Sequence, residues 1–126
     1  MSYIKPSDIK SSLIKGIDIT DYINEANNEI EDLAEALGVY NTSDIKRPVH
    51  NKVLRYGIVY ILMRLCQDKI GTNDVQVDAL EKYTIQYGMY KKELAQIRAE
   101  ISKEMVTGTV DNMGSRSVYS GTIFRA

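Results

Sequence analysis

Hydrophobic residues recur at helical spacing over most of the chain. A short pattern over residues 7–15 predicts a first helix, with Ser7 as its N-cap and Gly16 as its stop. A longer pattern over residues 19–37 predicts an amphipathic helix that ends at Gly38. The apolar face of this second helix consists of Ile19, Tyr22, Ile23, Ala26, Ile30, Leu33, Ala34 and Leu37.

The pattern between residues 48 and 69 differs, because apolar residues occur on nearly every side. A helix of this kind is surrounded by other elements, so we predict that it forms the centre of the fold. Pro48 suits the first helical position. Gly57, inside the helix, indicates a close crossing with a neighbouring helix; the alternative is a weak point that the helix tolerates.

A final helix is predicted to run to about residue 106, with a heptad seam that favours antiparallel packing on the central helix over a free coiled coil. The seam consists of Leu80, Tyr83, Tyr87, Tyr90, Leu94, Ile97 and Ile101. This helix would be roughly 48 Å long, against roughly 33 Å for the central helix. Its overhanging end would carry Ile101 and Met105, which need cover from the first helix or from a neighbouring copy.

Residues 107–126 break the helical pattern with three glycines and widely spaced large residues. A disordered tail is one interpretation. The other is a docking arm that pairs as short strands about Gly121 or adds a strand to a partner's sheet. The residues expected to bind a partner are Arg116, Tyr119, Ile123, Phe124 and Arg125.

Length and pattern together predict an all-α fold. The chain has 126 residues, which is enough for one hydrophobic core. We expect a helical domain over residues 1–106, built as a bundle of about four helices, one short and three longer. Residues 107–126 form the extended C-terminal arm, with any short β structure arising in an assembly.

Charge is segregated along the chain although the net charge is −1. Seven acids and no Lys or Arg lie between residues 18 and 40, whereas six bases and two acids lie between residues 41 and 71. Such a split suits complementary faces within one molecule or between copies. The residues expected at contacts between copies are Glu25, Glu29, Asp32, Lys52, Arg55, Ile101 and Met105.

The residues that usually carry chemistry are sparse. Cys66 is the single cysteine and His50 the single histidine, which excludes an intrachain disulfide, a cysteine metal cluster and a multi-histidine metal site within one chain. The chain has no phosphate-binding glycine motif or run long enough to span a membrane, and we expect no secretory signal because its first residues lack an apolar stretch. We therefore expect no enzymatic activity, cofactor, bound metal or membrane contact, and synthesis in a reducing cytoplasm.

The order of elements resembles the head–tail adaptor proteins of tailed bacteriophages, also called head-completion or connector proteins. The resemblance rests on the short first helix, the acidic segment Ile-Thr-Asp-Tyr-Ile-Asn-Glu-Ala-Asn-Asn-Glu-Ile, the apolar central helix, the Tyr-rich last helix and the tail. It implies a ring of identical subunits, commonly twelve, docked beneath the portal around a DNA channel. It further implies termini that reach the portal or the next tail component, a place in the virion neck, and DNA that passes without sequence-specific binding.

Two other classes of function stay open at the level of sequence. One is a small cytoplasmic helical adaptor or regulator that binds a single protein partner. The other is a DNA-binding accessory factor, for which Lys46, Arg47, Lys52 and Arg55 could form a small phosphate-binding patch.

Overall fold

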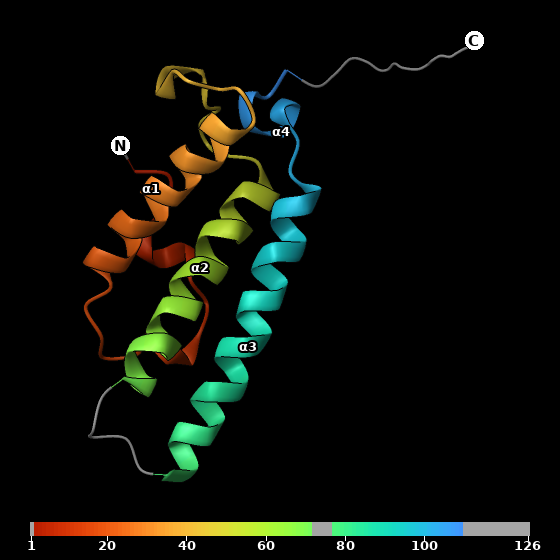
Figure 1. Ribbon diagram of the computed structural model, residues 1–126. Helices are drawn as coiled ribbons and strands as arrows, with labels where there is room; N and C mark the ends of the chain where they lie inside the picture. Colours follow the sequence, from red (N-terminus) through yellow and green to blue (C-terminus); the bar gives the residue numbers. More distant parts are fainter. Residues whose placement is uncertain (1, 72–76, 110–126) are drawn as a thin grey trace.

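The computed structural model describes residues 2–71 and 77–109, and every regular element within them is helical. Three long helices lie side by side, and a short one follows the upper end of the third (Figure 1). The predicted all-α bundle is confirmed. The α-helices are α1 (Thr20–Ala36), α2 (Asn51–Ile70), α3 (Val77–Glu100) and α4 (Lys103–Thr107), and the 3-10 turns are η1 (Pro6–Asp8), η2 (Ser12–Ile14) and η3 (Thr42–Asp44).

The predicted helix over residues 7–15 is wrong, because the chain forms the separate turns η1 and η2 there. Ile9 has extended backbone angles between them. Polar side chains compete for the backbone: the Asp8 carboxylate accepts the Lys5 N–H at 2.9 Å, and Ser11 Oγ accepts the Leu13 N–H at 3.2 Å. Ile4 and Ile9 are buried, so the segment still belongs to the core.

Helix α1 has the amphipathic form predicted for it. The Asp18 carboxylate accepts the Thr20 N–H at 3.0 Å just before its first turn, and Gly38 follows its end with a φ of 93°. One buried polar side chain, Asn27, accepts the Tyr3 N–H at 2.9 Å and holds the N-terminal segment against the helix. The buried face consists of Ile23, Ala26, Asn27, Ile30, Leu33 and Ala34.

Helix α2 is the central helix, but it begins later than predicted. Pro48 lies outside it, after a cis peptide bond with Arg47, and His50 is the N-cap. His50 Nδ1 accepts the Lys52 N–H at 3.1 Å, so the histidine has a capping role. The close crossing predicted at Gly57 is confirmed, because a Cβ there would overlap Ile4 Cδ1 and lie 3.2 Å from Ile30 Cδ1.

The final helix does not run to residue 106, so the predicted overhang is wrong. Helix α3 ends at Glu100, and Ser102 then caps the short helix α4 by accepting the Met105 N–H at 3.3 Å. The bend buries Ile101 and Val106 in the core. Tyr90, Leu94 and Ile97 of the predicted seam also pack on the core, next to α2.

Candidate interaction surfaces

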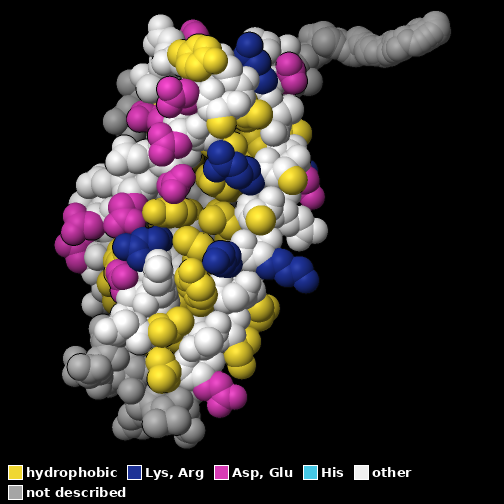
Figure 2. Space-filling model, in the orientation of Figure 1, with side chains coloured by type: hydrophobic (Ala, Val, Ile, Leu, Met, Phe, Trp, Pro, Cys, Tyr) yellow, Lys and Arg dark blue, Asp and Glu magenta, His cyan; other side chains and the backbone are white. Residues whose placement is uncertain are grey.

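The outer face of α1 carries acidic side chains that the rest of the molecule only partly neutralises. Figure 2 shows acidic side chains gathered over this helix. Glu25 accepts hydrogen bonds from Arg64 Nε at 2.9 Å and from the Tyr60 hydroxyl at 3.2 Å. Glu29 and Asp32 form no ion pair within residues 2–71 and 77–109. The face therefore keeps uncompensated negative charge.

The basic residues of α2 face two different helices. Arg64 reaches α1 through Glu25, but Lys52 and Arg55 pair with α3. Lys52 Nζ lies 2.9 Å from a Glu100 oxygen, and Arg55 Nη2 lies 2.6 Å from a Glu93 oxygen. The acidic helix and these two predicted contact residues thus do not neutralise each other within one chain.

Three tyrosine hydroxyls donate hydrogen bonds to carboxylates along α1 and α2. Tyr3 donates to Glu31 at 2.9 Å, and Tyr22 donates to Asp68 at 2.5 Å. Loss of water on burial, reinforced by the neighbouring carboxylates, raises the pKa of Tyr3, Tyr22 and Tyr60 to about 12. These phenols stay neutral and fix the orientation of the acids.

Sequence reasoning missed this arrangement. It assigned the tyrosines chiefly to the seam of α3, and the partners in space are far apart in sequence. Tyr22 and Asp68 are 46 positions apart, and no local pattern connects them. Only the packing of α1 on α2 brings the two side chains together.

The apolar contact residues predicted near the end of the last helix are not a free surface. Ile101 is 5% exposed, so it is a core residue and the prediction that it contacts a neighbour is wrong. Met105 is half-buried. Among the residues that the structure describes, the most exposed large hydrophobic side chains are Tyr40, at 80%, and Ile85 and Met89 of α3, at 58% and 65%.

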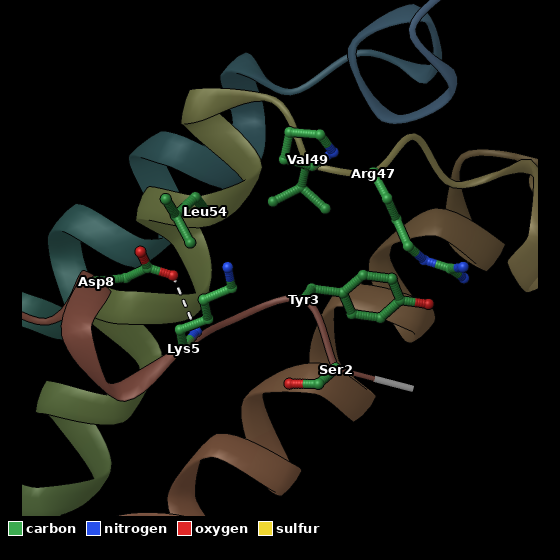
Figure 3. Close-up of a pocket in the computed structure, with 8 residues that line it drawn as sticks. Ser2, Tyr3, Lys5, Asp8, Arg47, Val49 and Leu54 are labelled. Atoms are coloured by element: carbon green, nitrogen blue, oxygen red, sulfur yellow. Dashed lines mark hydrogen bonds between the residues drawn. The ribbon is translucent and has the colours of Figure 1, made fainter.

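A pocket of about 570 Å³ lies where the N-terminal segment meets the start of α2. Figure 3 shows the Arg47 side chain beside the Tyr3 ring at one end of it, with the guanidinium carbon 5.4 Å from the ring centroid. The opposite end holds Lys5 and Asp8. The lining residues are Ser2, Tyr3, Lys5, Asp8, Arg47, Pro48, Val49 and Leu54.

No cluster of three His, Cys, Asp or Glu side chains suited to a metal ion occurs in the part of the chain that the structure describes. Cys66 is buried, and loss of water raises the pKa of its thiol, which makes the thiolate less available. None of the helices described has the length and apolar character needed to cross a membrane.

The arm residues predicted to bind a partner, Arg116, Tyr119, Ile123, Phe124 and Arg125, lie outside the described residues. Comparisons of the whole chain with models of protein families, with curated proteins and with solved structures give no match. The interpretation of function therefore depends on the surfaces described above and on the order of elements in the sequence.

Proposed function

We propose that this chain is a structural connector of a tailed-bacteriophage virion. Copies of it form a ring beneath the portal, join the capsid to the tail and surround the channel through which DNA passes. The observation that carries the proposal is the acidic face of α1, where Glu29 and Asp32 have no ion-pair partner within the described residues. Charged faces without internal partners suit contacts between different protein surfaces.

The C-terminal arm supplies charge of the opposite sign. Arg116 and Arg125 accompany Tyr119, Ile123 and Phe124 in sequence, a combination of bases and large apolar groups common at interfaces. The arm docks on the portal, on the next tail component or on the acidic α1 of an adjacent subunit. A closed ring lets a subunit with two different binding faces assemble without forming fibres.

Co-expression with the portal and tail proteins of the same genome tests the proposal. We expect the full chain to be recovered in purified particles and in ring-shaped complexes under the electron microscope. Deletion of residues 114–126 should leave helix content and thermal unfolding nearly unchanged and abolish incorporation.

A charge-matched pair of variants separates the arm from general charge effects. Arg116→Glu with Arg125→Glu should prevent incorporation, whereas Lys10→Glu with Lys15→Glu, at exposed positions, changes the net charge equally and should not. Full-length protein that is absent from particles and does not bind the portal would contradict the connector function.

One observation favours the alternative of a helical adaptor for a single protein. The pocket at Tyr3, Lys5 and Arg47 has the size of a site for one large side chain or small ligand. A stable one-to-one complex with a host protein, and no ring with the portal, would support that function. The DNA-binding alternative loses part of its basis, because Lys52 and Arg55 are paired with α3. Salt-dependent binding of duplex DNA would revive it.

A further inference from the structure

The pocket at the N-terminal segment combines an apolar wall with a cationic rim. Val49 and Leu54 are half-buried and line it together with the Tyr3 ring. Lys5 is exposed, and its ammonium has no partner within the described residues. Arg47 at the other end donates one hydrogen bond, to the Thr42 carbonyl at 3.2 Å. Such a site fits an apolar or aromatic side chain that is flanked by negative charge.

Asp8 is the one acid in this lining, and it is already engaged. Its carboxylate accepts the Lys5 backbone N–H at 2.9 Å (Figure 3). The remaining charges of the lining, on Lys5 and Arg47, are positive. A ligand with acidic residues is therefore favoured over a basic one.

Tyr40 is the most exposed large hydrophobic side chain in the described part of the chain, and its backbone is held firmly. The preceding residue, Val39, is buried, and its N–H donates to the Ala34 carbonyl at 2.8 Å. The following residue, Asn41, caps the turn η3 by accepting the Ser43 N–H at 3.1 Å. An aromatic side chain presented on an ordered backbone loses little conformational entropy on binding, which is the behaviour of an interface anchor.

An acidic residue is the nearest charged residue to Tyr40 on each side in the sequence. The charged residues nearest to it on either side are Glu35 and Asp44. Glu35 forms no ion pair within the described residues, whereas Asp44 lines a shallow hollow together with Lys103. Glu35 is therefore the acid best placed to meet a cationic rim.

We propose that Tyr40 of one copy inserts into the pocket of a second copy, with Glu35 directed toward Lys5. The phenol ring packs on Val49 and Leu54. Because the anchor and the pocket are different surfaces, the contact is heterologous and each subunit can both give and receive one. This contact specifies which surfaces of two subunits meet in the proposed ring, and it rests on the self-association that the proposed function requires.

Two other occupants fit the pocket less well. The subunit's own Tyr40 is 80% exposed, so it does not fill the pocket of its own chain. The arm carries Arg116 and Arg125, whose charge has the same sign as the rim. The arm suits the acidic α1, and the pocket suits Tyr40 together with Glu35 at the end of α1.

Photo-crosslinking of the full chain tests the contact directly. Tyr40 is replaced by p-benzoylphenylalanine, which keeps an aromatic ring, and the cross-linked peptides are mapped by mass spectrometry. We expect intermolecular cross-links to residues 3–8 and 47–54. The same probe at Met89, which is also exposed, should give no cross-link to those residues.

Substitutions test the energetics of the same contact. Tyr40→Ala should weaken self-association about tenfold or more, measured by sedimentation over a range of concentrations, while Tyr40→Phe should change it little. Lys5→Glu and Glu35→Lys should each weaken association, and the double variant should recover it. All three positions are exposed, so circular dichroism should show unchanged folding.

The outcomes separate this contact from the connector function. Rings whose cross-links map away from the pocket, or Tyr40→Ala rings that form as readily as the unchanged protein, would overturn the contact and leave the connector function standing. Cross-links to the pocket in closed two-fold dimers, without rings, would support the contact and count against the connector. A chain that never self-associates, with or without the portal, would overturn both.

Discussion

Helices α2 and α3 have similar lengths but differ in how far their side chains are buried. Eight of the 20 residues of α2 are buried, and other elements cover it on several sides. Over the part of α3 whose side chains are described, residues 79–100, only Ile97 is buried, and Ile85 and Met89 are largely exposed. The difference shows that α2 carries the core, whereas α3 packs along one side of it and leaves a face free.

A charged residue at a buried position of α2 should give the largest difference in stability between variants of the two helices. Leu62→Asp would place an unpaired carboxylate in the core and should unfold the domain, a loss of about 5 kcal/mol or more. The matched change on α3, Met89→Asp, should alter the free energy of unfolding by less than about 0.5 kcal/mol. Circular dichroism and urea unfolding measure both. A folded Leu62→Asp variant would disprove the central position of α2.

Alkaline pH should lower the stability of the fold through tyrosines that pack along α1 and α2. The pKa values of Tyr3, Tyr22 and Tyr60 are raised from 10.0 to about 12 in the folded protein, so the folded state holds protons that the unfolded state releases. Their contribution to stability is fully present below about pH 10 and is lost as the pH rises through about 12. Urea unfolding across this pH range should show the decline.

A double variant serves as the control for the pH effect. Tyr22→Phe with Tyr60→Phe removes two of the three phenols and should flatten the dependence of stability on pH between 10 and 12. An equally steep dependence in the double variant would show that other groups cause it.

Substitutions at the two mid-helix glycines, Gly57 and Gly88, should change the stability of the fold by smaller amounts and in opposite directions. Gly57→Val would force apolar atoms against Ile4 and Ile30 and should destabilise the fold by about 1–3 kcal/mol. Gly88 is exposed, and a Cβ there would have nothing within 4 Å, so Gly88→Ala should stabilise by about 0.5–1 kcal/mol. Differential scanning calorimetry should show melting temperatures moving in opposite directions; a shift in the same direction would contradict the difference in packing.

The smallest effect is expected at the ion pairs between the two helices. Arg55→Gln removes the pair with Glu93, and both side chains are well exposed to water. The loss of stability should be below about 1 kcal/mol and should shrink further at high salt. The loss is measured by unfolding in urea without guanidinium. A loss of stability above about 2 kcal/mol would mean that the ion pair is needed to hold α3 on α2.

Sequence periodicity was sufficient for the long helices and insufficient for their ends. The apolar residues of α1 and α2 define their helices because burial of a continuous face requires that spacing. The first segment escaped prediction because Asp8 and Ser11 bond to the backbone locally, which favours turns over a helix. The break at Ile101 escaped because Ser102 fits a helix interior by pattern yet serves as a cap.

The interaction surfaces were less accessible to sequence reasoning than the helices. The acidic character of α1 was visible in its composition, whereas the pocket was not. Its lining comes from residues 2–8 and 47–54, and only the packing of the N-terminal segment on α2 brings them together. The exposure of Tyr40 was equally invisible, because it depends on which distant segments pack beside the end of α1.

The attachment of α4 has a mechanical consequence. The Val106 carbonyl accepts the Lys46 N–H at 2.8 Å, and Gly108 adopts a φ of 73° directly against the Lys46 side chain. A pulling force applied at residue 109 would therefore act at the same time on the end of α3 and on the segment between α1 and α2. The helical body would resist a pull at this point as one piece, and α3 would not peel away first.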